Sequence, residues 1–389
     1  MRTVQRYIHG QIYKAVLFVC VGFLGLFSFF DVISELTFTS RTPIPYGMKN
    51  ALVHTLLLMP GHTYELLPIA LLIGAIFVMA GLAQSSEFTI LRTGGLGPGQ
   101  ALRSLLWLGA LFTVLTFVTG DYIAPRTEKL AQFYKAQFEG NITAGRTGAW
   151  IKENVDGIDR IVNIGQLTAE GQMRDLRIFD FDQQGALAQM RKAETGEFAD
   201  NGWRLGNVSS TITQAASSAQ TESSTQEAST TQAANKQQQG GSQQQVVRQL
   251  LGEQELKTGI KQTMVAAALL NPNRMSTYEL YRYIIHLKAN NQSAQSYEVQ
   301  FWRKLFYPLS CLVMVMLALP FAYLHFRSGN ITTVVFIGVV VGVSFFLLNN
   351  LFGYIANLRE WLPWVSAAVP SLIYMALSLF AFRWLVRYR

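Results

Sequence analysis

The 389-residue chain is 50% hydrophobic, 12% aromatic and only 14% charged, whereas about 25% of residues are charged in an average soluble domain. So few charges cannot cover a soluble protein of this length, and the composition therefore predicts a membrane protein. The formal net charge is +8, but the basic residues are scattered at the ends of apolar segments, which argues against a nucleic-acid partner. The two cysteines, Cys20 and Cys311, lie inside apolar segments and predict no disulfide framework.

Six apolar segments can cross a bilayer, because about twenty helical residues span roughly 30 Å of hydrocarbon. The first runs from Ala15 to Phe30 and less purely to Leu36. It is similar to a signal peptide but no small-residue cleavage site follows it, so we expect a retained span. The other five expected spans are Leu66–Ala83, Ser104–Thr119, Leu305–Leu324, Ile331–Ala356 and Leu362–Val386.

Polar residues beside the first three spans constrain their placement. A carboxylate at the bilayer centre costs roughly 2.5 to 3.5 kcal/mol, so Asp31 and Glu35 must lie near an interface or face a protein-lined cavity. Between the first two spans, Met48–Met59 predicts an amphipathic helix that is too short to cross and that ends at Pro60. A polar helical extension, Glu128–Phe138, follows the third span.

The polar stretch Gln84–Gln100 separates the second and third spans. Ser85 or Ser86 can cap a helix there, and Glu87 would lie in its first turn, where the helix dipole favours a carboxylate. Gly94, which a second glycine follows, can end this helix after about two turns.

The helix predicted near residues 84–95 has one apolar face. Phe88 and Leu91 are three residues apart, and Ile90 lies between them. This face can lie against lipid headgroups or dock into a groove on another protein. An ordinary interfacial connector between two spans is the alternative.

The basic residues in the short connections predict the orientation, because cytoplasmic loops carry an excess of Lys and Arg. One side of the membrane has only Arg41, Lys49 and Arg359. The other side has Arg2, Arg6, Lys14, Arg92, Arg103, Arg327, Arg383, Arg387 and Arg389. Both termini and the stretch at 84–100 are therefore predicted to be cytoplasmic, and the region between the third and fourth spans lies on the far side.

Residues 141–275 predict a separate all-β domain on that far side. Short, partly alternating segments indicate strands of a sandwich or an open barrel. These segments are Trp150–Lys152, Arg160–Ile164, Arg174–Phe181 and, with a turn at 200–202, Phe198–Leu205. The β pattern resumes weakly at Gly259–Leu269.

Residues 211–245 within that domain are almost wholly Ser, Thr, Gln and Ala. They cannot bury enough apolar surface to offset the entropy of ordering them, so we expect a flexible insertion. A polar recognition tail is the alternative. Past the domain, in region 276–389, Ser276 and Glu279 have the spacing of a capping box, which opens an amphipathic helix to about Lys288.

The sequence contains no catalytic motif. There is no G-x-x-x-x-G-K-[ST] phosphate loop and no G-x-S-x-G nucleophile, and turn chemistry explains the glycines from Gly94 to Gly99. The five histidines form no H-x-x-x-H or H-E-x-x-H pair, so we expect no metal and no cofactor. The chain is not expected to be an enzyme, and the energy for any work must come from a partner.

Three segments, in this order along the chain, resemble the LptF/LptG permease family of the lipopolysaccharide export transporter. They are QSSEFTILRTGG at Gln84–Gly95, RTGAWIK at Arg146–Lys152 and YEVQFWRKLFYPLS at Tyr297–Ser310. The last two are more similar to the LptG branch than to the LptF branch. The resemblance implies a polytopic α-helical membrane protein of the bacterial inner membrane, with six transmembrane helices and an inserted periplasmic jelly-roll-like domain.

The resemblance also implies a function. Such a permease extracts lipopolysaccharide from the inner membrane and passes it to a periplasmic bridge, with ATP hydrolysis on a separate subunit. The implied partners are a second, LptF-like permease, a cytoplasmic LptB-like ATPase dimer, a single-span LptC-like regulatory subunit and an LptA-like bridge. Energy is needed because moving one acyl chain of about a dozen carbons into water costs on the order of 10 kcal/mol.

The family's functional positions can be carried onto this chain. The implied ATPase-coupling residues are Ser86, Glu87, Phe88, Leu91, Arg92 and Gly94. The implied lateral gate involves spans one and five, with Phe23, Phe27 and Phe30, and the implied lipid path in the β domain includes Trp150 and Ile178. We expect headgroup contacts at Arg41, Lys49 and Lys135, for which solvated interfacial anchors are the alternative.

One feature departs from the family pattern, because the outer end of span one has Asp31 and Glu35 where LptG-like chains have lysines. Reception of lipid charge by span one is therefore in doubt. Two other classes of protein stay open. A mechanotransmission permease would need a coupling helix but no lipid path, and a membrane scaffold or sensor would need neither.

Overall fold

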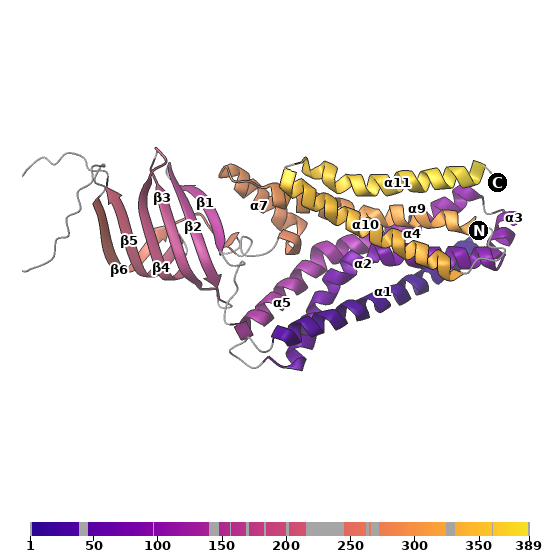
Figure 1. Ribbon diagram of the computed structural model, residues 1–389, viewed down its shortest axis with the longest axis horizontal. Helices are drawn as coiled ribbons and strands as arrows, with labels where there is room; N and C mark the ends of the chain where they lie inside the picture. Colours follow the sequence, from indigo (N-terminus) through magenta and orange to yellow (C-terminus); the bar gives the residue numbers. More distant parts are fainter. Residues whose placement is uncertain are drawn as a thin grey trace, which may run out of the picture. The chain divides into compact units, whose positions relative to one another are not determined.

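The computed structural model describes residues 2–38, 46–95, 97–139, 148–155, 157–168, 171–182, 184–199, 202–214, 245–261, 264–265, 272–323, 331–359 and 361–387 (Figure 1). The chain divides into two compact units. The helical unit comprises Met1–Gly140 and Leu270–Arg389, and the β unit comprises Asn141–Leu269. Six membrane-length helices with an inserted all-β domain were predicted, and this fold class is confirmed.

Six helical segments of the helical unit are long and apolar enough to cross a membrane. Their main helices are α1 (Arg2–Phe38), α2 (Met48–Gln84), α4 (Pro98–Val118), α9 (Ser310–Ala322), α10 (Ile331–Arg359) and α11 (Pro363–Arg387). In its most apolar window α2 is 83% buried, against 11% for α1. α2 is therefore the central helix, and α1, α9 and α10 pack on it. Both chain termini lie at one end of this bundle, which we call the terminal end (Figure 1).

The continuity of α2 corrects the prediction of a break at Pro60. One helix runs through both Pro60 and Pro68, as membrane helices allow when neighbouring groups satisfy the freed backbone. The next residue, Gly61, does not end a helix either. A Cβ there would lie 2.3 Å from Oε1 of Glu128 on α5 (Ala124–Glu139). Gly61 therefore serves the close approach of a side chain that is far away in sequence.

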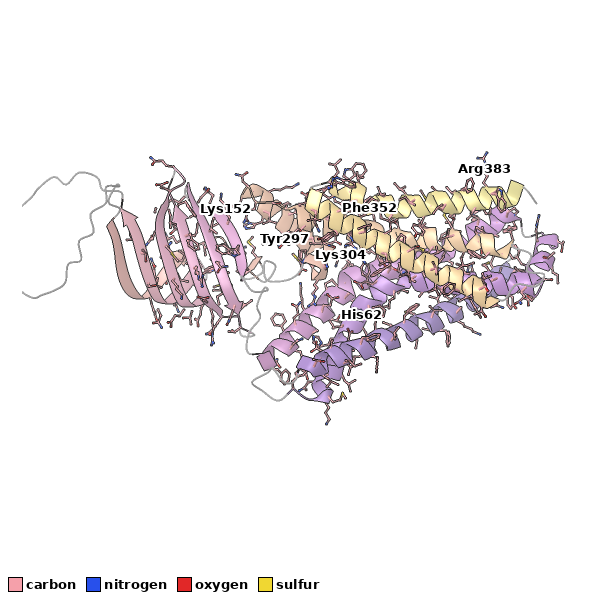
Figure 2. The ribbon with its side chains drawn as sticks, viewed as in Figure 1. His62, Lys152, Tyr297, Lys304, Phe352 and Arg383 are labelled. Carbon is pink, nitrogen blue, oxygen red and sulfur yellow. The ribbon has the colours of Figure 1, made fainter. Side chains whose placement is uncertain are left out.

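A π-helical segment, Thr119–Ile123, joins α4 to α5 without a turn. Gly120 allows it to pack on α2, because a Cβ there would lie 2.2 Å from the Tyr64 ring. The Gly120 carbonyl accepts a hydrogen bond of 3.2 Å from the buried Lys304 ammonium (labelled in Figure 2). The third span and its predicted polar extension are thus one continuous rod, Pro98–Lys135.

The predicted capping box is confirmed at the start of α7 (Thr277–Ala289), where Ser276 and Glu279 exchange both hydrogen bonds. The Thr277 amide also donates to Oδ1 of Asp121 at 2.6 Å, and Glu279 pairs with Lys129. These contacts attach α7 to the π segment and to α5. The remaining elements of this region are a 3-10 turn (Pro272–Arg274), α8 (Gln295–Phe306) and a second 3-10 turn (Tyr307–Leu309).

The β unit is one antiparallel sheet in the order β1-β2-β3-β4-β5-β6. Its strands are β1 (Ala149–Val155), β2 (Ile158–Leu167), β3 (Met173–Phe181), β4 (Leu187–Ala199), β5 (Gly202–Gln214) and β6 (Gln245–Lys257). The predicted strand segments fall within β1 to β5. The described residues of the segment expected at 259–269, which are 259–261 and 264–265, form no strand, and the rest of it lies outside the described residues. The last strand of the sheet lies earlier, at 245–257, where it pairs with β5.

The predicted flexible insertion also starts later than expected, because residues 211–214 belong to β5 and Gln245 opens β6. Residues 215–244 lie outside the described residues. The sandwich, barrel or jelly-roll arrangement stays a prediction, since the described strands form a single sheet.

A row of unpaired positions crosses the sheet at one level. The registers of β2 to β6 all omit one step, and the residues at that step are Gly165, Asp175, Glu194, Asn207 and Gly252. We call this row the crease. Asp175 and Asn207 have positive φ angles of 51° and 53°. Buried residues lie three apart across the crease instead of two apart, as Leu205 and Val208 do on β5. At the crease each strand therefore has one additional residue opposite that of its neighbour, which keeps the register in step and the same face of the sheet buried.

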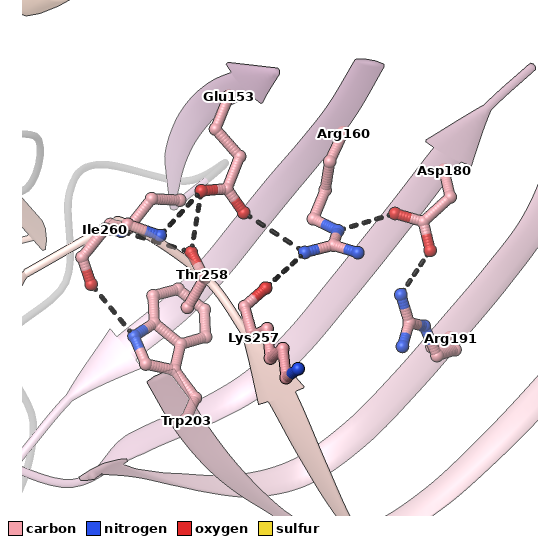
Figure 3. A network of polar contacts seen from close by, with 9 residues as sticks. Glu153, Arg160, Asp180, Arg191, Trp203, Lys257, Thr258 and Ile260 are labelled. Carbon is pink, nitrogen blue, oxygen red and sulfur yellow. Dashed lines mark hydrogen bonds and ion pairs between the residues drawn. The ribbon is translucent and has the colours of Figure 1, made fainter. Parts of the chain in front are cut away.

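A network of four charged side chains is buried on that face (Figure 3). Arg160 Nε donates to Oδ1 of Asp180 at 2.6 Å, and Arg160 Nη1 donates to Oε1 of Glu153 at 3.3 Å. Asp180 also pairs with Arg191. Two carboxylates and two guanidinium groups balance in charge, as burial of ions requires.

The network also joins the two edge strands. Glu153 on β1 accepts hydrogen bonds from Thr258 Oγ1 at 2.8 Å and from the Gly259 amide at 3.1 Å. Arg160 donates to the Lys257 carbonyl at 2.8 Å, and the Trp203 indole donates to the Ile260 carbonyl at 3.1 Å. The chain that leaves β6 is thereby fastened to β1 and β2, which closes the buried face at this end of the sheet (Figure 3).

Removing the buried carboxylate should loosen this end of the sheet. We expect Glu153→Ala to lower the local stability of β1 and of residues 257–260 by about 3 kcal/mol or more, because Arg160 loses a buried partner. Hydrogen exchange of the full chain would show this as faster exchange at the Gly259 amide. Asp159→Ala is the matched control, since Asp159 has a carboxylate that is 42% exposed and pairs with Lys152. Equal acceleration in both variants would contradict the role of the network.

Acidification should weaken the start of α7. Burial raises the pKa of Glu279, but hydrogen bonds from Lys129 and from the Ser276 backbone outweigh it, so that the net pKa is lowered. A carboxyl group whose pKa is lowered by folding stabilises the folded state fully at a pH above its unfolded-state pKa of about 4.3. This stabilisation of the folded state is lost as the pH falls through the folded-state pKa. pH-corrected protection factors at Thr277 should fall over that range, and Glu279→Gln should abolish the dependence. The same pH dependence in Glu279→Gln would assign it to another group.

Candidate functional site

The predicted short helix between the second and third spans is α3 (Glu87–Thr93). Ser86 is its N-cap residue, but it is left-handed, with φ of 60°, and its side chain makes no capping bond. The expected serine cap is therefore not formed, and Ser86 instead turns the chain from α2 into α3. The helix ends at Gly94 as predicted, and Gly95 follows with φ of 104°, a conformation that favours glycine.

Phe88 anchors α3 to the bundle. Its side chain is 3% exposed and packs edge-on against the Tyr323 ring at 5.1 Å, directly after α9. Tyr323 in turn contacts Phe382 of α11, with ring centroids 6.4 Å apart. Phe88 also lines a small cavity between α1, α2, α4 and α9, together with Gln5, Ile8, Met79, Ala101, Ser104, Leu105 and Leu319. Phe88 thus lies where four helices, α1, α2, α4 and α9, meet, and it contacts α11 only through Tyr323.

The apolar face of α3 was expected either to lie against lipid headgroups or to dock on another protein. Phe88 and Leu91 pack into the chain's own core rather than presenting a face to another protein. The outward surface has Ile90, which is 68% exposed, and Arg92, whose guanidinium lies 5.8 Å from the centre of the Tyr323 ring. Glu87 is partly exposed and accepts a hydrogen bond of 3.1 Å from Tyr7 of α1.

This arrangement can transmit a push. A partner that binds the outward surface of α3 cannot displace this helix without also moving the Phe88 side chain. Because interiors are close-packed, Phe88 cannot move without shifting the helix ends around it. The six predicted coupling residues lie on α3 or at its two caps, and the structure assigns Phe88 to the bundle side and Ile90 and Arg92 to the outer side.

Two of the three predicted headgroup residues lie among the described residues. Lys135 Nζ lies 2.9 Å from Oε1 of the buried Glu35. Lys49 is exposed near the start of α2. Arg41 lies outside the described residues. Lys135 is therefore paired with a carboxylate of α1.

The predicted gate residues lie along α1. Phe23 is half-buried, Phe27 is 37% exposed and Phe30 is 60% exposed. The Phe27 ring lies 5.4 Å from the His62 ring of α2. Apolar side chains also cover the outside of α10, where Phe336 is 65% exposed. Exposed faces of this kind suit contact with lipid or with another apolar helix.

Sequence reasoning missed the histidines that face the acidic residues of α1. His62 Nε2 lies 2.7 Å from Oδ2 of Asp31, and His54 Nδ1 lies 3.4 Å from Oε1 of Glu35. The two carboxylates are four residues apart and the two histidines eight apart, so each pair shares one helix face. The matching spacing of acidic residues and histidines was the signal in the sequence. The residues come into contact only because α1 and α2 pack antiparallel.

The two residues predicted for the lipid path lie on opposite faces of the β-sheet. Ile178 is fully buried on the face that holds the apolar core. Trp150 is 50% exposed and stacks on Phe179, the neighbour of Ile178 in β3. Because successive residues of a strand point to opposite faces, Trp150 and Ile178 cannot both line one interior path.

Comparison with known proteins agrees with the resemblance read from the sequence. Residues 6–384 match the family described as lipopolysaccharide export system permease LptF/LptG. The chain is 26% identical over 389 residues to the lipopolysaccharide export system permease protein LptG of Escherichia coli (strain K12), with 97% of each chain covered. It is 25% identical over 381 residues to LptG of Haemophilus influenzae (strain ATCC 51907 / DSM 11121 / KW20 / Rd), again with 97% of each covered. The protein therefore belongs to the LptF/LptG family of lipopolysaccharide export system permeases.

Proposed function

We propose that this permease extracts lipopolysaccharide from the inner membrane and passes it to a periplasmic bridge, driven by ATP hydrolysis on a separate subunit that pushes on α3. The observation that carries the mechanism is Phe88, which is 3% exposed at the meeting point of α1, α2, α4 and α9. A seven-residue helix fixed in this way is suited to convert movement of an outside partner into movement of the bundle.

The proposal places both termini and α3 in the cytoplasm and the β unit in the periplasm. The support is the distribution of basic residues. Arg92, Arg103 and Arg383 all lie toward the terminal end of the bundle, and Figure 2 shows Arg383 pointing away from α11 there. The chain is a multi-pass membrane protein of the lipopolysaccharide export permease family, and we propose that it lies in the bacterial inner membrane.

The proposed partners follow from the surfaces that the helices expose. A second, LptF-like permease would cover the apolar faces of α1 and α10, and the single helix of an LptC-like subunit would lie beside α1. An LptB-like ATPase dimer would bind the outer surface of α3, around Ile90 and Arg92. An LptA-like bridge would receive lipid from the β unit.

Two other classes of protein are weaker explanations. A membrane scaffold needs no surface helix anchored where four others meet. A mechanotransmission permease would use α3, but it would need neither a lipid path nor a sheet with a buried apolar face. The six spans and the family match over residues 6–384 favour the lipid transporter.

Charge reversal at the start of α3 should uncouple the ATPase. We expect Glu87→Arg to weaken ATPase association by about 10-fold or more, because reversing a charge at an interface brings it against like charge on the partner, which costs several kcal/mol. The bundle should stay folded, since Glu87 is only partly buried. The measurement is co-purification of the ATPase in mild detergent together with lipopolysaccharide export.

Arg383→Glu is the control for this variant, because it also reverses an exposed charge toward the terminal end but lies on α11. It should retain the ATPase. Normal association and export in Glu87→Arg would remove the coupling role from Glu87. Recovery of the unaltered chain without a second permease, an ATPase or lipopolysaccharide would favour the scaffold.

Photo-crosslinking should locate the lipid path in the β unit. An aliphatic diazirine residue close in size to isoleucine, placed at position 178, should capture lipopolysaccharide during export, because Ile178 lies on the buried apolar face. The same probe at Trp150, on the opposite face, should capture little. Capture at position 150 alone would move the proposed path to the other face of the sheet.

A further inference from the structure

The first half of α1 is held by close apolar packing. Ile8, Ile12, Val16 and Cys20 recur every fourth residue, and each is at most 8% exposed. They belong to the core of the helical unit. Val16 approaches α2 so closely that a Cβ on Gly74 would lie 2.8 Å from it. This half of the helix cannot move without opening that contact.

The second half of α1 is held differently. Among the residues from Val21 to Thr37, Glu35 alone is buried, and the others are half-buried or exposed. The exposed ones are mostly apolar, such as Leu26, Phe29 and Phe30, at 50 to 60%. The helix here therefore lacks the core packing that fixes its first half.

Charged contacts fasten this second half instead. Asp31 pairs with His62 of α2 at 2.7 Å, and Glu35 pairs with Lys135 of α5 at 2.9 Å and lies 3.4 Å from His54. We call Asp31, Glu35, His62 and Lys135 the α1 latch; Figure 2 marks His62. Lys135 and His62 stay 24% and 22% exposed. A contact held by charge at a partly exposed site can be exchanged for another anion, whereas close apolar packing cannot.

Two glycines lie between the packed half and the latched half. A Cβ on Gly22 or on Gly25 would meet nothing within 4 Å. Close helix approach, which explains Gly74 and Gly120, therefore does not explain them. Glycine is a weak helix former because its backbone keeps more freedom in the unfolded chain. α1 is thus weakest where its two kinds of attachment meet.

We propose that the second half of α1 swings about Gly22 and Gly25, and that a lipid-headgroup phosphate opens the α1 latch by competing with Glu35 for Lys135. This proposal rests on the proposed function, because it assigns the competing anion to lipopolysaccharide. Ammonium groups bind phosphate through short, charge-assisted hydrogen bonds. The Glu35 carboxylate stands in for the phosphate until lipid arrives. In this proposal Asp31 and Glu35, the acidic residues at the outer end of span one, hold the gate closed until the lipid arrives.

Distance measurements on the full chain test the hinge. Spin labels at Phe30 of α1 and Leu130 of α5, both about 60% exposed, report the position of the second half. Introduced cysteines label selectively because Cys20 and Cys311 are buried. In phosphatidylcholine nanodiscs, adding lipopolysaccharide should create a population with a longer distance. The double variant Gly22→Ala, Gly25→Ala should lose it.

Gly10→Ala is the matched control, since Gly10 lies on the same helix and a Cβ there also meets nothing within 4 Å. It should keep the longer-distance population. Labels at Leu17 and Trp107, on the packed half of α1 and on α4, should show no change in any variant that is folded. A double glycine variant that behaves like the unaltered chain overturns the hinge, as does an equal loss in Gly10→Ala.

The latch has its own test. Glu35→Gln should show the longer distance before any lipid is added. Glu298→Gln is the control and should not show it, because Glu298 of α8 pairs with Lys288 of α7 rather than with a residue of α1. Lipopolysaccharide stripped of its headgroup phosphates should fail to open the unaltered chain. Equal opening by stripped and intact lipid overturns the competition.

Failure of this inference differs from failure of the proposed function. Lipopolysaccharide export by the unaltered chain in cells is scored separately from the label distances. A chain that exports lipid without a longer-distance population contradicts the latch alone. A chain that exports no lipid contradicts the proposed function, whatever the label distances show.

Discussion

Polar groups inside an apolar bundle must find partners within the protein, because lipid offers none. This requirement organises the helical unit. The Lys304 ammonium reaches the carbonyl that the π segment frees at Gly120, and Asp121 beside it receives the first amide of α7. The charged residues of α1 and α5 satisfy each other through Glu35 and Lys135. The apolar surface of α2 gives the helices a common core, and these few polar contacts decide how they are aligned on it.

The features that could be predicted from the sequence are the local ones. Span positions follow from runs of apolar residues, and the capping box from Ser276 and Glu279, three residues apart. The features that could not be predicted depend on distant residues. Gly61 looks like a helix end until Glu128, 67 positions later, is seen to occupy the space beside it. β6 is rich in glutamine, and it becomes a strand because β5 pairs with it over its whole length.

The candidate site divides in the same way. The position and length of α3 could be predicted from a polar stretch with two serines at its start and two glycines at its end, but the direction of its side chains could not. Phe88 turns inward because Tyr323, more than two hundred residues away, offers a ring to pack on. Likewise, the carboxylates of α1 were visible as an anomaly, and only the packing of α1 on α2 and α5 shows which cations meet them.

The crease has a consequence for how the β unit tolerates change. If β5 slid by one residue against its neighbours, the left-handed position of Asn207 would fall on Gly206 or Val208. Gly206 could adopt the left-handed backbone, but Asn207 would then have to adopt a strand conformation. Val208 is β-branched and strongly disfavours the left-handed backbone. Each strand from β2 to β6 contributes one residue to the crease. A shift of one strand would therefore move its residue out of the crease and disturb the register with both neighbouring strands. The register of β5 against β6 is therefore fixed within the two strands themselves, and it does not depend on the length of chain that connects them.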